Sequence, residues 1–241
     1  MEILSKQPLY QSLVNDRKNC RLCSTVEMRN PDEINKAYDS DQVGPWTQWQ
    51  GDLDASLMIV GQDWGGEKYF IKIQGREEDT NPTNRNLCEL LRSIGFSIEL
   101  PNQPQSITTG LFFTNAVLCC KRGGLVGPVP SQAVGNCSRH FLARQIELVR
   151  PKAVATLGYE AYRSVCYAYG YFPVSTISEA IASPDLLTIG YGSTLVPVHH
   201  CGHYGTSRRR LTEHKHDWQR IATVLRNWEP KPSRLSCSCY M

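Results

Sequence analysis

The sequence has no apolar run long enough to cross a membrane. No stretch of its 241 residues approaches the roughly 18 to 20 consecutive apolar residues that a transmembrane helix needs. The N-terminal MEILSKQPLY has no basic region followed by an apolar segment, so it does not resemble a signal peptide. We therefore expect a cytoplasmic protein without membrane contact, and we expect a monomer.

Internal repeats, low-complexity segments and the glycine patterns of nucleotide-binding proteins are also absent. Neither GxGxxG nor a P-loop occurs, which argues against a Rossmann-type nucleotide enzyme. With 41% hydrophobic residues, the chain is long enough to bury a large core. We expect a single domain over residues 1–241, in which residues 1–50 form a polar, irregular accessory layer and residues 229–241 a mobile tail.

Cysteine, by contrast, is abundant. Ten cysteines in a chain without an export signal argue against a disulfide framework, because reducing compartments keep thiols free. Metal or cluster ligation, or plain burial, explains them better. The net charge of +3 is modest, but basic islands occur near residues 17, 120, 207 and 231 and predict a localised basic surface.

Four short apolar segments, at residues 56–63, 110–118, 153–158 and 194–200, predict strands. They are continuous rather than alternating, which suits parallel strands covered on both faces. The segments 83–96, 136–150 and 210–227 have helical spacing of apolar residues. This order predicts an α/β fold, a three-layer α/β/α sandwich with a central four-stranded parallel sheet.

Polar residues stand at the ends of three of these strands. Asp63 follows the first, Asn115 ends the second and His200 follows the fourth. Taken singly, an Asp or Asn at a strand end is often a turn former or helix cap, and a lone His is most often a surface residue. In open parallel sheets, however, ligands bind beyond the carboxyl ends of the strands. Three such residues at equivalent positions favour a shared polar site.

Four motifs in this order resemble those of the uracil-DNA glycosylase superfamily: GQDWG, TNAVLC, NCSRHFLARQIELVRPKAVATLG and PVHHCG. The resemblance is closest to the iron-sulfur branch, which carries G-E-x-P-G, T-N-x-V-K-C, a C-x-x-x-L helix leading to P-K-x-x-x-x-L-G, and a late Y-H-P-S. It extends over residues 18 to 226. It implies a monofunctional DNA glycosylase that removes a pyrimidine and leaves an abasic site.

The resemblance assigns chemical roles to the three polar residues. Breaking an N-glycosidic bond requires stabilisation of a cation-like sugar and of a departing pyrimidine anion. Asp63 resembles the acid that holds the attacking water and offsets the sugar's charge, and His200 resembles the residue that hydrogen-bonds the pyrimidine O2. Asn115 resembles the base reader: its amide can accept from N3–H and donate to O4 of uracil, and a flipped amide would suit cytosine.

The resemblance also implies that the target base is flipped out of DNA. The backbone of Gly61 and Gln62 can approach the base, because glycine has no side chain. In superfamily members an apolar wedge follows the His by four residues, and Tyr204 holds that position here. A basic run is usually a solvated loop, but beside His200 we expect phosphate contacts. This run comprises Arg208, Arg209 and Arg210.

Four cysteines match the ligand positions of the iron-sulfur branch, namely Cys20, Cys23, Cys119 and Cys137. Four thiolates suit a 4Fe-4S cluster, with tetrahedral zinc as the less favoured alternative. Such a cluster would tie the N-terminal layer to the loop after the second strand, and Cys120 competes with Cys119 for one position. The remaining cysteines are interpreted as buried thiols (Cys88, Cys166, Cys201) or tail residues (Cys237, Cys239).

The sequence departs from the superfamily pattern beside the acid and the histidine. Trp64 stands where Pro or a small residue is usual. Gly65 stands where strict uracil enzymes have a tyrosine that blocks the pyrimidine C5 position, although the iron-sulfur branch also has glycine there. Glycine leaves room for a C5 substituent. Cys201 and Gly202 replace the proline and serine after the motif His, which leaves His199 and His200 as alternatives.

The aromatic residue that stacks on the base is also missing from its segment, which reads GREEDTNPTNR. Tyr69, Phe70 or Trp64 could replace it. Alternatively, the pocket is larger and more polar, and hydroxyl groups bind there to side chains such as Asp79, Asn81 and Asn84.

These departures leave three hypotheses. The first is removal of uracil from DNA. The second is excision of a bulky, C5-modified cytosine from foreign DNA, which would make the protein an anti-phage defence enzyme. The third is a DNA-binding module that has lost catalysis, which the joint presence of Asp63, Asn115 and His200 argues against.

Overall fold

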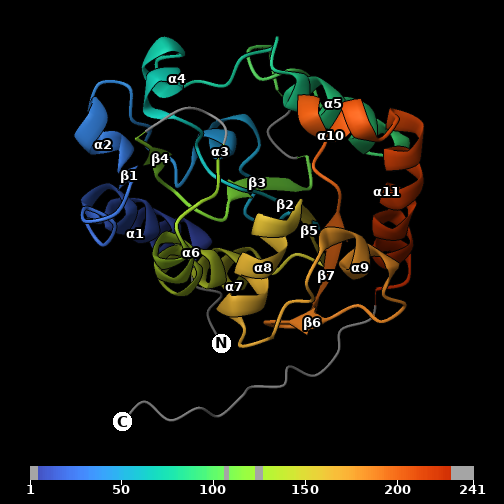
Figure 1. The fold of residues 1–241 in the computed structure, drawn as a ribbon. Helices are drawn as coiled ribbons and strands as arrows, with labels where there is room; N and C mark the ends of the chain where they lie inside the picture. Colours follow the sequence, from blue (N-terminus) through green and yellow to red (C-terminus); the bar gives the residue numbers. More distant parts are fainter. Residues whose placement is uncertain (1–4, 106–108, 123–126, 229–241) are drawn as a thin grey trace.

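A parallel sheet between two layers of helices forms the centre of the molecule (Figure 1). The computed structural model describes residues 5–105, 109–122 and 127–228. Within these ranges the sheet has the order β3-β2-β5-β7-β6, and only β6 is antiparallel to its neighbour. Its strands are β2 (Leu57–Gly61), β3 (Leu111–Asn115), β5 (Ala153–Leu157), β6 (Thr188–Ile189) and β7 (Ser193–Val198). The predicted sandwich with four parallel strands is confirmed, and β6 is a short edge strand that the sequence did not reveal.

The helices that follow and connect these strands cover both faces of the sheet (Figure 1). They are α3 (Pro45–Trp49), α4 (Glu67–Lys72), α5 (Pro82–Ser93), α6 (Ser131–Cys137), the π-helical turn η1 (Ser138–Leu142), α7 (Ala143–Val149), α8 (Tyr159–Ala168), α9 (Ile177–Ala182), α10 (His203–Arg208) and α11 (Leu211–Arg226). The predicted helix over 136–150 is therefore the second half of a longer helical run from α6 to α7, which ends just before Pro151.

The core is divided in two by the sheet, because successive side chains of a strand point to opposite faces. Along β2, Met58 and Val60 belong to the cluster that packs against α1 (Lys6–Asn19), α6, α7 and α8. Leu57 and Ile59 belong to the cluster that packs against α3, α5 and α11. All residues of β2 are buried, as the continuous apolar pattern predicted. Burial on both faces fixes where each strand ends, and thus where its polar residues emerge.

The N-terminal layer is more regular than expected. It contains α1 (Lys6–Asn19), β1 (Met28–Arg29) and α2 (Pro31–Ile34), and β1 pairs antiparallel with β4 (Cys120–Lys121). The polar appearance of this segment was misleading because Arg17 on α1 is only 1% exposed and forms an ion pair of 2.6 Å with the equally buried Asp39. The expectation of an irregular layer was therefore wrong for residues 6–19.

Two further predictions concern membranes and the chain end. None of the helices in the described part of the chain is both long enough and apolar enough to cross a bilayer. The predicted mobile tail at 229–241, with Cys237 and Cys239, lies outside the described residues.

Candidate active site

A cavity of about 530 Å³ lies at the carboxyl ends of the parallel strands. Asp63 reaches it from the turn after β2, Asn115 from the last position of β3 and His200 from the turn after β7. β2 lies beside β3 and is separated from β7 by β5 alone, and all four strands are parallel, so their ends meet at one edge of the sheet. The structure therefore brings together the three residues that the sequence placed at strand ends.

The carboxylate of Asp63 is buried and held by donors on several sides. Its Oδ1 accepts a hydrogen bond of 2.6 Å from the Gly65 N–H, and its Oδ2 accepts one of 2.8 Å from Nε2 of Gln62. Nζ of Lys121 lies 3.1 Å from the same Oδ2. Gly65 is needed for the first of these bonds, because its φ of +80° is a conformation that residues with side chains rarely adopt.

Lys121 was missed as a site residue. It belongs to the basic island near residue 120, which predicts an exposed side chain, but the residue is only 6% exposed and lines the cavity. Its position beside Cys119 and Cys120 gives no signal of an ion pair with Asp63, because the two residues come from separate elements.

Asn115 lines the cavity and carries an unpaired acceptor. Its side chain is 2% exposed, and Oδ1 has no hydrogen-bond partner, although leaving a buried acceptor unpaired costs about 1 to 3 kcal/mol. Gly61 does not line the cavity but makes room for this amide: a Cβ at position 61 would lie 2.5 Å from Oδ1 of Asn115 and 2.6 Å from the ring of Trp46. Such an acceptor suits a ring N–H of a bound base.

The ring of His200 is held in one tautomer. Its Nδ1 accepts a hydrogen bond of 3.0 Å from the Gly202 N–H, so the proton of the neutral ring sits on Nε2. Burial lowers the pKa of His200; the nearby Asp63 raises it and His214 lowers it further. A neutral imidazole with Nε2–H is a donor that can stabilise negative charge on a leaving group.

His199, the alternative to His200, does not line the cavity. Its ring meets that of His214 edge to face, with centroids 6.2 Å apart. Burial, then the nearby Arg209, lowers the pKa of His199, and Asp217 opposes this shift. Of the two adjacent histidines, the structure therefore places His200 at the candidate site.

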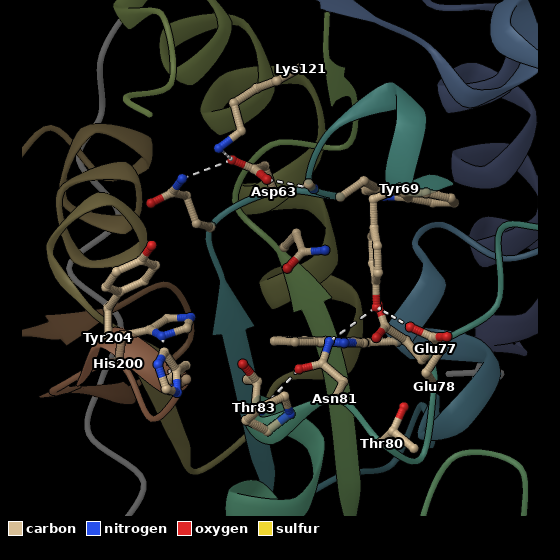
Figure 2. Close-up of a pocket in the computed structure, with 18 of the residues that line it drawn as sticks. Asp63, Tyr69, Glu77, Glu78, Thr80, Asn81, Thr83, Lys121, His200 and Tyr204 are labelled. Atoms are coloured by element: carbon tan, nitrogen blue, oxygen red, sulfur yellow. Dashed lines mark hydrogen bonds and ion pairs between the residues drawn. The ribbon is translucent and has the colours of Figure 1, made fainter. Parts of the chain in front are cut away.

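The wall opposite His200 is acidic and polar (Figure 2). The Tyr69 hydroxyl lies within hydrogen-bond distance of Oε2 of Glu78 (3.2 Å) and of Nδ2 of Asn81 (3.4 Å). Burial raises the pKa of Glu77, whose Oε2 accepts a bond of 3.0 Å from Asn84. The cavity-lining residues of this segment are Glu77, Glu78, Thr80, Asn81, Pro82 and Thr83.

Only one of the three polar residues named for hydroxyl binding reaches the cavity. Asn81 lines it, whereas Asn84 is fully buried behind Glu77 and Asp79 bonds to the backbone N–H of Asn102 at 2.8 Å. Glu77 and Glu78, which do line the wall, stand in the same segment, but no sequence pattern marks them as site residues.

The aromatic candidates differ in their placement. Tyr69 and Trp64 line the cavity, but Trp64 is only 6% exposed and packs against Phe70 with ring centroids 5.7 Å apart. Phe70 does not reach the cavity. Trp46, on α3, was not predicted and also lines it. Of the three predicted aromatic residues, Tyr69 is the partly exposed one that lines the cavity.

The segment after His200 forms the mouth of the cavity. Tyr204, on α10, is 68% exposed and lines the cavity edge. Arg208 and Arg210 are exposed, whereas Arg209 donates 2.9 Å to the buried Asp217. Two of the three predicted phosphate contacts are therefore open to solvent, and the third lies within an ion pair.

The four predicted cysteine ligands come together. Cys23, Cys119 and Cys137 belong to one buried cluster and Cys20 packs against it. Burial, followed by the proximity of the other three thiols, raises the pKa of Cys119. The competitor Cys120 points elsewhere, into a small cluster with Trp64 and Phe70.

The donor set of these four cysteines fits an iron-sulfur cluster in its chemistry, since thiolates are the ligands of such clusters. Within residues 5–105, 109–122 and 127–228, no group of three or more His, Cys, Asp or Glu side chains is arranged to hold a single metal ion. The other predicted buried thiols, Cys88, Cys166 and Cys201, are buried.

Comparison with known proteins agrees with this geometry. Over 178 residues the chain is 29% identical to the type-5 uracil-DNA glycosylase of Pyrobaculum aerophilum, an alignment that covers 67% of this chain and 71% of the relative. The family model of the uracil DNA glycosylase superfamily matches residues 48–222, which include Asp63, Asn115 and His200. The chain belongs to the uracil DNA glycosylase superfamily.

Proposed function

We propose that this protein flips a pyrimidine nucleotide out of DNA and hydrolyses its N-glycosidic bond, leaving an abasic site, as a monofunctional glycosylase that acts as a monomer. The observation that carries the proposal is the unpaired, buried Oδ1 of Asn115 beside Asp63 and His200 in one cavity. A flipped base would supply the missing donor, and no other contact in the described residues does so.

Each residue has a task in this reaction. Tyr204 would fill the space that the flipped nucleotide leaves in the duplex, because it is exposed at the cavity mouth. Asn115 binds the base edge and Tyr69 stacks on the ring. Nε2–H of His200 donates to the pyrimidine O2 as negative charge develops there. Asp63 holds the attacking water and offsets positive charge on the sugar.

The cysteine cluster supports a 4Fe-4S group rather than zinc. Each thiolate of such a group binds a different iron, so the four sulfurs spread more widely than around one zinc ion. When bound, the group would cross-link α1, β4 and α6 near Cys20, Cys119 and Cys137, and it would not touch the base.

The experiment is release of a base from end-labelled duplex DNA that carries one deoxyuridine, followed by alkaline cleavage at the abasic site. We expect activity in the wild type and a loss of about 100-fold or more in Asp63→Asn and His200→Ala. His199→Ala is the matched control, because this neighbour does not line the cavity. Base release that survives both substitutions would contradict the roles of Asp63 and His200. A wild type that binds the duplex but releases no base would instead favour the DNA-binding module without catalysis.

A second candidate substrate is a C5-modified cytosine, which would give the protein a role in defence against foreign DNA. The acidic wall favours this substrate, because Glu77, Glu78 and Asn81 offer hydrogen-bond acceptors. A bare uracil ring has no donor for these acceptors, whereas hydroxyl groups on a C5 substituent would supply donors. The cavity of about 530 Å³ is in the range of sites for ligands larger than a base.

The same assay on a panel of duplexes separates the substrates. The panel holds uracil, hypoxanthine, a thymine mismatch, 5-hydroxymethylcytosine and a glycosylated hydroxymethylcytosine. Release of uracil alone would remove the second candidate. Preferential release of the hydroxyl-bearing bases would establish it.

A further inference from the structure

A buried lysine touches the buried carboxylate of the candidate site. Nζ of Lys121 lies 3.1 Å from Oδ2 of Asp63, with side chains 8% and 5% exposed. Lysine is almost never buried unless it is paired, and burying an ammonium group requires a compensating partner. The pairing therefore indicates a purpose for Lys121 at Asp63 rather than a chance surface contact.

Main-chain contacts tie the same two segments together. The Lys121 N–H donates 2.8 Å to the Gly65 carbonyl oxygen, and the Gly65 N–H donates 2.6 Å to Oδ1 of Asp63. With the ion pair, these bonds close a ring that runs from Asp63 through Gly65 and Lys121 back to Asp63. The ring leaves the carboxylate little freedom to rotate or shift.

The donors divide unequally between the two carboxylate oxygens. Oδ2 is near both Nε2 of Gln62 and Nζ of Lys121, whereas Oδ1 accepts from the Gly65 N–H. Each oxygen has two acceptor positions, so these contacts occupy both on Oδ2 and leave one on Oδ1. A water molecule held by Asp63 would therefore be held at Oδ1.

Lys121 alone among these donors brings a charge. Gln62 and the Gly65 N–H hold the carboxylate by hydrogen bonds between neutral donors and oxygen, whereas the ammonium group of Lys121 adds an electrostatic attraction to Oδ2. In Figure 2, Lys121 approaches Asp63 from the side away from His200. The lysine is itself held from behind, since Nζ donates 3.2 Å to the Gly127 carbonyl oxygen.

We infer that Lys121 is a positioning residue, which holds the carboxylate of Asp63 in place and directs the free acceptor of Oδ1 toward the attacking water. Lys121 acts through Asp63 and forms no bond to the sugar. The inference rests on the proposed glycosylase function for its kinetic part, and on the ion pair itself for its spectroscopic part.

The kinetic test uses Lys121→Met, which removes the charge, and Lys121→Arg, which keeps it. In single-turnover reactions with enzyme in excess, we expect Lys121→Met to lower the cleavage rate by about 10- to 100-fold with little change in DNA affinity. Lys121→Arg should recover most of the rate. The control is Lys18→Met, which breaks the Lys18–Asp41 ion pair outside the cavity.

A double-mutant cycle tests whether Lys121 acts through Asp63. Adding Lys121→Met to Asp63→Asn should lower the rate by less than about twofold, because the carboxylate that the lysine serves is already gone. Independent, multiplying losses would overturn the inference, as would an unchanged rate in Lys121→Met. Trapping of a covalent DNA complex with borohydride would also overturn it and show that Lys121 is a nucleophile.

An NMR test of the ion pair does not require catalytic activity, and it uses two uncharged variants in case one of them does not fold. The side-chain carboxyl ¹³C resonance of Asp63 is assigned by its loss in Asp63→Asn. It should shift in Lys121→Met and Lys121→Gln, return in Lys121→Arg and stay in place in Lys18→Met. If the wild type cleaves no duplex, the proposed function fails, but this test still shows whether Lys121 contacts Asp63. A resonance that does not move in either uncharged variant would overturn the inference about Lys121.

Discussion

Gly61 and Asn115 face each other at the ends of β2 and β3, in register as parallel partners, with no space for a side chain at position 61. A Cβ there would lie 2.5 Å from Oδ1 of Asn115 and 2.6 Å from the Trp46 ring. The glycine therefore sets the position of the amide that is proposed to read the base.

Gly61→Ala should damage both the fold and the site. Overpacking of this kind costs about 1 to 3 kcal/mol of unfolding free energy, and displacement of the Asn115 amide should lower base release at the same time. Gly135→Ala is the matched control, because a Cβ at position 135 meets nothing within 4 Å. Denaturant unfolding and the cleavage assay measure both effects; wild-type behaviour of Gly61→Ala would contradict the packing argument.

The three consecutive arginines should divide into two classes. Arg208 and Arg210 are exposed, so Arg208→Ala and Arg210→Ala should each weaken DNA binding and reduce the salt dependence of log K by about 1. These variants should keep the stability of the wild type. Fluorescence anisotropy with labelled duplex at several salt concentrations measures the slope.

Arg209→Ala should instead destabilise the protein. The side chain of its partner Asp217 is only 8% exposed, and a buried carboxylate that loses its partner costs about 1 to 3 kcal/mol. We expect a lower unfolding midpoint and a salt slope close to that of the wild type. A slope reduced as much as in Arg208→Ala would show that Arg209 leaves Asp217 to bind phosphate.

His214 should make the fold sensitive to mild acid. The residue is fully buried and neither ring nitrogen has a hydrogen-bond partner. Burial lowers the pKa of His214; His199 and Arg209 lower it further, and Asp217 opposes them. In the unfolded chain the histidine returns to a pKa of about 6.5, so near this pH the unfolded state binds more protons than the folded state.

Stability therefore falls as the pH drops below about 6.5, and the contribution of His214 is complete above that pH. Unfolding curves between pH 5 and 8 measure the slope. His214→Leu should flatten it by up to about 1.4 kcal/mol per pH unit and leave stability at pH 8 equal or higher. Replacing the exposed His140 is the control, and an equal slope in His214→Leu and wild type would refute the assignment.

The polar residues at the strand ends could be predicted from the sequence, whereas the buried lysine beside Asp63 could not. Leu57 to Gly61 is a continuous apolar run, and parallel topology then brings Asp63, Asn115 and His200 to one edge. Lys121 gives no such signal, because a lysine in a polar sequence is normally exposed and its partner is distant in the chain. Its burial depends on β4 pairing with β1, a tertiary contact that no local pattern specifies.

Glu77 should affect the choice of substrate more than the chemistry. Its carboxyl group lines the wall opposite His200, away from Asp63. Glu77→Gln should therefore release uracil at a rate near that of the wild type but lose about 10-fold on hydroxyl-bearing cytosines, because a strong acceptor becomes partly a donor. Glu89→Gln, at an ion pair with Lys215, is the control; equal losses on all bases would assign Glu77 a structural role.

Cys119 and Cys120 should differ in iron binding although they are neighbours in the chain. The thiol of Cys119 is near those of Cys137, Cys23 and Cys20, whereas Cys120 packs beside Trp64 and Phe70. We therefore expect Cys119 rather than Cys120 to bind the cluster. Purified wild-type protein should carry about four iron atoms and a visible absorption band. Cys119→Ser should lose the iron, the absorption band and part of the stability, because α1 and α6 would no longer be cross-linked.

Cys120→Ser should keep the iron and the absorption band. Colourless wild-type protein with one zinc ion would contradict the cluster, and loss of iron in Cys120→Ser alone would exchange the two roles.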